Sequence, residues 1–207
     1  MAKSVHVLGL DPGFASLGYV VVSFEPSHNW MGVLQRSGSP VMGTIRTEKS
    51  NKKRSVKASD DNLRRGRELY NALSFLMGSA PSEHPAFPFV LGEEALNIQA
   101  VCAESMSFPR SASTAQKIGI TWGIISSISD FYNVPIVQAS PQEIKKRVCG
   151  NKSASKESVQ ESLAEQFDID PLIFNKTLRE HPFDALGAVV ACQDSEVIRM
   201  ALKMAAA

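Results

Sequence analysis

The sequence contains little cysteine and no long apolar run. Its three cysteines are scattered, and none belongs to a Cys-x-x-Cys pair or lies beside a histidine at a zinc-ligand spacing: Cys102, Cys149 and Cys192. This pattern argues against a disulfide framework and a structural zinc site, and it favours a reducing compartment. No apolar stretch is long enough to cross a membrane, and the N-terminus has no apolar signal core. We therefore expect an intracellular protein with no membrane partner.

The chain also lacks a strong net charge. The formal charge is +1 for 207 residues, so bulk attraction would not hold it to a polyanion. The basic residues are nevertheless clustered. The segment 46–67 carries nine of them against three acids, and the segment 145–156 carries five and no acid. A charge run is most often a solvated surface, and binding to phosphate groups is the alternative interpretation.

A length of 207 residues suits one domain, and the sequence has no internal repeat. The first half is rich in strand-forming residues, whereas strands and helices alternate from residue 101 to residue 137. This order predicts an α/β sheet that includes an antiparallel hairpin. Helices are predicted over residues 60–77, 112–132, 155–167 and 182–204.

A carboxylate closes each of two predicted strands. The apolar run 5–10 ends on Asp11, and the Pro-Gly pair that follows forces a turn into a second strand at residues 18–24. This predicts a hairpin with Asp11 near its open end. The apolar run 100–103 likewise ends on Glu104. A buried strand rarely carries an unpaired acid, because its desolvation is costly unless a cation or hydrogen bonds compensate.

A histidine and another acid lie near the start of a predicted helix. Pro182 suits the first helical position, and the apolar run 185–192 continues the helix. His181 is then the N-cap, and Asp184 lies on the same side of the first turn, where free N–H groups and the helix dipole keep it ionised. Taken singly, these acids and the histidine could be an ordinary turn, a salt-bridged strand end and a helix cap. Together they favour a site for a hard divalent cation.

These residues carry a resemblance to the RuvC family of Holliday-junction resolvases, which belongs to the ribonuclease H-like superfamily of metal-dependent nucleases. The matching segments follow the family's order: Leu8-Gly9-Leu10-Asp11-Pro12-Gly13 with Gly18-Tyr19, Ala103-Glu104 with Ser113-Thr114-Ala115-Gln116-Lys117-Ile118-Gly119, Pro135-Ile136-Val137 with Ser140-Pro141-Gln142-Glu143-Ile144-Lys145-Lys146, and His181-Pro182-Phe183-Asp184-Ala185-Leu186. The resemblance implies a divergent bacterial or phage member with one RuvC-like nuclease domain over residues 1–207. Its fold would be α/β, a ribonuclease H-like mixed five-stranded sheet flanked by helices.

The resemblance also implies a site and a mechanism. Matched by position, the catalytic and metal-binding residues would be Asp11, Glu104, His181 and Asp184, and the family has Asp or His at position 181. The expected activity is structure-selective cleavage of four-way junctions by paired symmetric nicks. Its chemistry would be two-metal phosphodiester hydrolysis that leaves 5′-phosphate ends, with Asp11 bridging two Mg²⁺ ions and Mn²⁺ able to substitute. His181 can bind a metal only when its imidazole is neutral.

The implied partner is four-way junction or branched DNA. We expect the DNA contacts to come from both basic clusters and from the segment after the second acid: Lys52, Lys53, Arg54, Lys57, Arg64, Phe108, Arg110, Lys145, Lys146, Lys152 and Lys156. The family often has an aromatic residue three positions after the central Glu, inserted at the crossover. That position is Ser107 here, so Phe108 either supplies the contact after a one-residue shift or belongs to the core.

A homodimer is expected as well, because a junction presents two equivalent strands to cut. The helix 112–132 is a candidate interface, since apolar and small residues recur along it at helical spacing: Ile118, Trp122, Ile125 and Ser126. Such a stripe is also consistent with plain core. The expected location is the cytoplasm, associated with the nucleoid, or the host cytoplasm for a viral chain.

Three other functions compete with this one. Actin-like and sugar-kinase ATPases also open with strand, Asp-x-Gly and strand, but this chain is too short for two such domains and has no second Asp-x-Gly. A broader branched-DNA or flap nuclease remains open, because Ser107 departs from the family pattern. A non-catalytic junction-binding module is the third alternative, and the presence of Asp11, Glu104 and Asp184 argues against it. The segment 81–99 is not assigned from the sequence: a surface insertion and a part in partner binding are both open.

Overall fold

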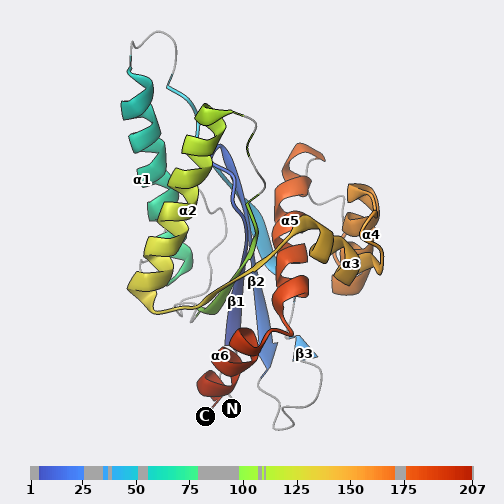
Figure 1. The fold of residues 1–207 in the computed structure, drawn as a ribbon. Helices are drawn as coiled ribbons and strands as arrows, with labels where there is room; N and C mark the ends of the chain where they lie inside the picture. Colours follow the sequence, from blue (N-terminus) through green and yellow to red (C-terminus); the bar gives the residue numbers. More distant parts are fainter. Residues whose placement is uncertain are drawn as a thin grey trace.

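The computed structural model describes residues 5–25, 35–36, 39–50, 56–78, 98–106, 109, 111–170 and 176–206. One mixed sheet lies at its centre (Figure 1). Its main strands run β4-β2-β1-β5-β6 across the sheet, with β1 antiparallel to β2 and parallel to β5: β1 (Val5–Asp11), β2 (Ser16–Glu25), β4 (Val41–Arg46), β5 (Ile98–Glu104) and β6 (Ile136–Ala139). The two-residue strand β3 (Gln35–Arg36) pairs with the end of β2. The predicted five-stranded mixed sheet is confirmed, with β3 as an addition.

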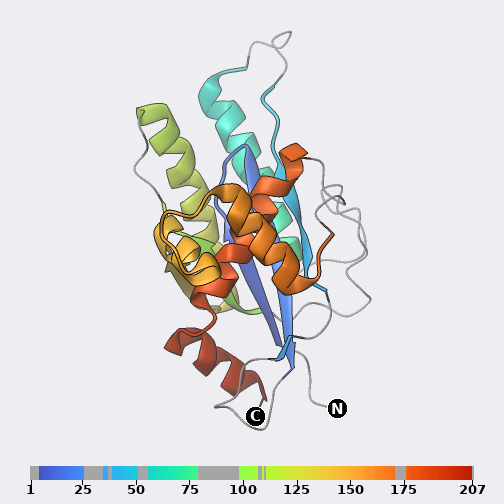
Figure 2. The ribbon, with the colours of Figure 1, turned by 90° about the vertical axis from the view of Figure 1, so that its right-hand side faces the viewer.

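Helices cover both faces of the sheet. Figures 1 and 2 show α1 (Ala58–Leu76) and α2 (Ala112–Tyr132) on one face and α5 (Lys176–Cys192) on the other. The helices α3 (Pro141–Cys149) and α4 (Lys156–Phe167) pack outside α5, and α6 (Glu196–Ala206) lies at the end of the sheet where β1 begins. None of the described helices is both long and apolar enough to cross a membrane.

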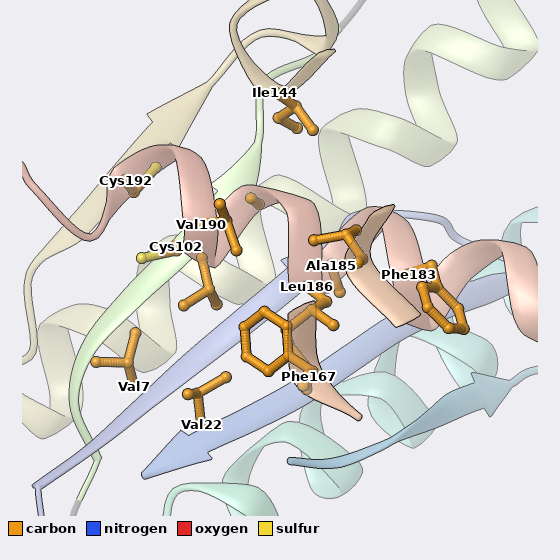
Figure 3. Packing of buried hydrophobic residues seen from close by; sticks show 14 of the residues in the cluster. Val7, Val22, Cys102, Ile144, Phe167, Phe183, Ala185, Leu186, Val190 and Cys192 are labelled. Atoms are coloured by element: carbon orange, nitrogen blue, oxygen red, sulfur yellow. The ribbon is translucent and has the colours of Figure 1, made fainter. Parts of the chain in front are cut away.

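The alternation of side chains along β1 divides the core into two layers. Val5 and Val7 face α5, whereas Leu8 and Leu10 face α1 and α2, because successive strand residues point to opposite faces. Figure 3 shows the α5 side, where Phe183 and other large side chains gather over the strands. Asp11 has the same parity as Val7, so its carboxylate belongs to the α5 face.

The final predicted helix, residues 182–204, is wrong in both its start and its length. Helix α5 begins at Lys176 and continues through Pro182, which removes one intrahelical hydrogen bond without stopping the helix. The chain then breaks, and Ser195 begins α6 by accepting a hydrogen bond on Oγ from the N–H of Ile198 at 3.3 Å. The sequence contained this cap signal, but the apolar pattern on both sides of it obscured the break.

The other three helices lie within two residues of their predicted bounds: α1 at Ala58–Leu76, α2 at Ala112–Tyr132 and α4 at Lys156–Phe167. The hairpin is present, but Asp11 pairs with Gly18 directly beside the turn. Asp11 therefore lies at the closed end of the hairpin, and the predicted open end is wrong. The Pro-Gly turn predicted directly after Asp11 already requires the closed end.

Gly9→Ala tests the contact between β1 and α5. A Cβ at position 9 would lie 2.5 Å from the carbonyl oxygen of Ala185, so the variant should lose about 1–3 kcal/mol of unfolding free energy, the usual cost of overpacking. In Gly119→Ala, the matched control, the added methyl meets no atom within 4 Å. The control should be unchanged or up to about 1 kcal/mol more stable. Chemical denaturation measures both, and wild-type stability of Gly9→Ala would contradict the packing.

Candidate active site

Two carboxylates meet at one edge of the sheet because their strands are parallel neighbours. Leu10 of β1 pairs with Ala103 of β5, so the residues that end these strands, Asp11 and Glu104, lie side by side. Glu104 has the parity of Cys102, which faces α5, and Asp11 has the parity of Val7 on the same face. Both carboxylates therefore point toward α5 at the carboxyl end of the strands. This part of the sequence prediction matches the geometry.

Helix α5 brings a histidine against the first acid. A Cβ at Gly18 would lie 2.1 Å from the carbonyl oxygen of His181, so only glycine lets the backbone of α5 approach β2 this closely. His181 Nδ1 then lies 2.6 Å from Asp11 Oδ2. An ionised carboxylate only accepts hydrogen bonds, so Nδ1 carries the proton and donates. This bond, and then the negative charges of Asp11, Glu180 and Asp184, raise the pKa of His181 against the opposing effect of burial.

The remaining acids carry raised pKa values. Burial, followed by the charges of Asp11 and Asp184, raises the pKa of Glu104 to about 7. Burial also raises the pKa of Asp184 to about 6, where the charge of Lys156 opposes the rise and those of Asp11 and Glu180 add to it. The prediction that a helix N-terminus keeps Asp184 ionised is wrong, because Asp184 lies in the interior of α5, where the backbone N–H groups are already bonded.

Lys156 lies closer to this cluster than its sequence context suggested. Its Nζ donates to the carboxylate of Glu180 and lies 3.5 Å from Asp184 Oδ2. The sequence placed Lys156 among the DNA contacts and did not single out Glu180. The one available signal for Glu180 was its place directly before His181. The structure thus adds a cation and a fourth carboxylate to the predicted set.

A cleft runs beside the first two acids. It has a volume of about 80 Å³, and apolar and small residues share its wall with Asp11 and Glu104: Pro12, Ser105, Met106, Ile118 and Trp122. Two of these, Ile118 and Trp122, were predicted to face a second copy of the chain. Of that predicted stripe, Ile125 is core and only Ser126 is exposed. The four residues predicted from the sequence as a dimer interface therefore do not form one exposed face of α2.

The donor set fits a hard divalent cation. Carboxylate oxygens are the ligands that Mg²⁺ prefers, and the carboxylates raise one another's pKa values, which is the repulsion that a bound cation would relieve. Among the described residues, no three His, Cys, Asp or Glu side chains are arranged to hold one ion as they stand. The hydrogen bond between His181 and Asp11 uses Nδ1 and Oδ2, so the atoms that could bind a metal while it persists are Nε2 of His181 and Oδ1 of Asp11.

Apart from Lys156, the predicted DNA contacts fall into three groups. Lys145, Lys146 and Lys152 are exposed or half-buried on α3 and directly after it, and Lys57 is exposed before α1. Arg64 instead pairs with Asp61 at 2.8 Å and with Glu68. The remaining contacts lie outside the described residues, as does Ser107: Lys52, Lys53, Arg54, Phe108 and Arg110.

The sheet order, with acids at the carboxyl ends of β1 and β5, places the chain in the ribonuclease H-like class. The solved structure of Thermus thermophilus RuvC covers 90% of this chain and 92% of its own with a TM-score of 0.64 at 19% identity. The same protein in complex with a Holliday junction substrate gives a TM-score of 0.63 at 18% identity. At these identities the likeness shows the fold, and the predicted ribonuclease H-like fold is confirmed.

Sequence comparison identifies the family. The crossover junction endodeoxyribonuclease RuvC of Pseudothermotoga lettingae is 30% identical over 162 residues, which cover 76% of each chain. The enzyme of the same name from Natranaerobius thermophilus is 24% identical over 170 residues, or 80% of this chain and 83% of the relative. No protein-family model matches the sequence. The chain belongs to the RuvC family of crossover junction endodeoxyribonucleases, as the sequence motifs predicted.

The raised pKa of Glu104 predicts how stability depends on pH. From about pH 4.5 to about 7, folded Glu104 holds a proton that the unfolded chain has released, so metal-free protein should lose stability as pH rises through this range. Glu104→Gln cannot ionise and should lose that part of the slope. Denaturant unfolding in EDTA across this range measures it. Parallel curves for the two proteins would show that Glu104 has an ordinary pKa.

Proposed function

We propose that this chain is a metal-dependent endonuclease that resolves four-way DNA junctions by paired symmetric nicks, with Asp11, Glu104, His181 and Asp184 as its catalytic residues. The observation that carries the proposal is the meeting of these side chains at one sheet edge, where the carboxylates repel one another. Membership of the RuvC family supports it, because the relatives are crossover junction endodeoxyribonucleases by name.

We assign the metal site to the same residues, with two Mg²⁺ ions per active site and Mn²⁺ as a substitute. When bound, such ions activate the attacking water and stabilise the leaving oxygen. His181 contributes only when its imidazole is neutral, and the neutral ring can keep its Nδ1 hydrogen bond to Asp11 and offer Nε2 to the metal. Glu104 and Asp184 must be ionised, and their raised pKa values make binding weaker as pH falls.

Basic residues hold the DNA in this proposal. Lys156 exchanges its ion pairs with Glu180 and Asp184 for a phosphate oxygen close to the acids. Lys145, Lys146 and Lys152 bind flanking phosphates. Lys57, directly before α1, and Arg64 on α1 contact the DNA backbone. The same role is proposed for residues that the structure does not describe: Lys52, Lys53, Arg54, Phe108 and Arg110. We also propose that the chain is a single nuclease domain that acts in the cytoplasm.

Cleavage of an immobile four-way junction tests the activity. Wild type with Mg²⁺ should give paired symmetric nicks on the junction and none on linear duplex or flap DNA. Asp11→Asn keeps the size of the side chain and removes its charge. Its rate should fall by more than the roughly 10- to 100-fold typical of residues that only support metal ligands. Cleavage of flaps or duplex would indicate a broader nuclease. Junction binding without cleavage in Mg²⁺ or Mn²⁺ would indicate a binding module.

The two symmetric nicks require two active sites, most simply in a homodimer. We place the interface on the exposed face of α2, where Gly119, Gly123 and Ser126 recur at helical spacing. A Cβ added at Gly119 or Gly123 would meet no atom within 4 Å, so this face leaves room for a second helix to approach.

Gly123→Leu should therefore disrupt the dimer and leave the fold intact. Light scattering with and without junction DNA should give a dimer for wild type and a monomer for the variant. Arg199→Leu, at an exposed position of α6, is the matched control and should stay dimeric. A wild-type monomer on bound junction DNA would contradict the symmetric arrangement.

A further inference from the structure

We propose that Arg65 is a positioning residue that fixes the turn carrying Asp11 through contacts with Thr47 and Phe14. The inference rests on the proposed function, because it assumes that the orientation of Asp11 limits cleavage. It concerns α1, which lies on the face of the sheet opposite α5 and contributes none of the four proposed catalytic residues.

Thr47 ties the turn to the end of β4. Its backbone N–H donates to the carbonyl oxygen of Ala15 at 3.1 Å, and its Oγ1 hydroxyl donates to the carbonyl oxygen of Phe14 at 2.7 Å. The turn starts with a hydrogen bond from the N–H of Gly13 to the carbonyl oxygen of Asp11 at 2.9 Å. The carbonyl oxygens of Asp11, Phe14 and Ala15 are thus each held by a hydrogen bond.

Arg65 in turn fixes Thr47 and Phe14. Its Nε donates to Thr47 Oγ1 at 3.0 Å and its Nη2 donates to the carbonyl oxygen of Thr47 at 3.2 Å. The guanidinium lies over the ring of Phe14, 4.4 Å from the centroid. All three side chains are buried, with Arg65 only 2% exposed. The guanidinium of Arg65 therefore contacts both Thr47, which bonds the turn, and Phe14, which belongs to the turn.

Burial of the Arg65 charge costs free energy, which argues that this side chain does more than fill space. Arg65 forms no salt bridge with any carboxylate in the part of the chain that the structure describes. An isolated buried cation is expensive, and an apolar residue of similar length would fill the same space without that penalty. Methionine has a similar length but no hydrogen-bond donor. Only the planar guanidinium can donate to Thr47 and stack on Phe14 at the same time. The geometry is therefore suited to orientation of the turn.

Arg65→Met tests this role. At saturating junction DNA and Mg²⁺, the cleavage rate should fall about 10- to 100-fold, the scale of a misplaced catalytic group, with junction Kd within about twofold of wild type. Arg199→Met removes a guanidinium from exposed α6 and should match wild type in both. Thr47→Val should resemble Arg65→Met, whereas Thr47→Ser keeps the hydroxyl and should restore the rate.

Amide hydrogen exchange gives a readout that does not depend on cleavage. In metal-free Arg65→Met, the Thr47 and Gly13 amides should exchange at least about tenfold faster than in wild type, while amides of β5 should not change. An unchanged Thr47 amide, or a rate loss that follows the unfolded fraction measured by circular dichroism, would overturn the positioning role. Failure of wild type to cleave the junction would overturn the proposed function alone, because the exchange measurement stands without it.

Discussion

The site depends on how closely helix α5 packs against the β1–β2 hairpin. At Gly9 and Gly18 the backbone of α5 occupies the space where a side chain would begin, with carbonyl oxygens 2.5 Å and 2.1 Å from the positions of an added Cβ. The same helix buries Phe183 and Leu186 completely, so hydrophobic burial drives the contact that brings its polar residues to the strand ends. The packing of α5 against the hairpin therefore also assembles the candidate site.

This packing forces negative charges together. Three acids and an imidazole from β1, β5 and α5 share a half-buried region, and the result is a pair of raised carboxyl pKa values and a raised imidazole pKa. Lys156 and His181 lie against these carboxylates, and each shares a hydrogen bond with a carboxylate oxygen. In the proposed function, Lys156 would exchange its contacts for a phosphate oxygen. Protons and a metal ion would compete for the same carboxylate oxygens.

The sequence predicted the parts of the site that follow from local rules. A carboxylate at the end of each of two apolar strands is visible in the pattern, and parallel pairing brings Asp11 and Glu104 together without further information. The geometry of His181 and Asp184 was not predictable in this way. A proline usually marks a helix start, yet α5 begins upstream of Pro182, so Asp184 lies in a helix interior with a raised pKa. The approach of Lys156 depends on how α4 packs outside α5, which no local pattern encodes.

Arg65 was one residue in a basic run, and burial separated it from its neighbours. Arg64, the adjacent residue, is partly exposed and satisfied by Asp61 and Glu68, whereas Arg65 points into the layer beneath β1 and β2. A helix turns by about 100° per residue, so two consecutive arginines must face different environments. Composition counts both as surface charge, although only one of them is at the surface.

Asp11 is consequently held from both faces of the sheet. On the α5 face its carboxylate meets His181, and on the α1 face the turn that follows it is held by Thr47, Phe14 and Arg65. Leu10 and Phe14, on either side of Asp11, pack in the layer beneath α1 and α2, whereas Val7, with the parity of Asp11, packs in the layer beneath α5. The backbone of Asp11 is thus held by packing on one face while its carboxylate is held on the other. The rigidity that the proposed role of Asp11 requires thus follows from contacts on both faces of the sheet at the end of one strand.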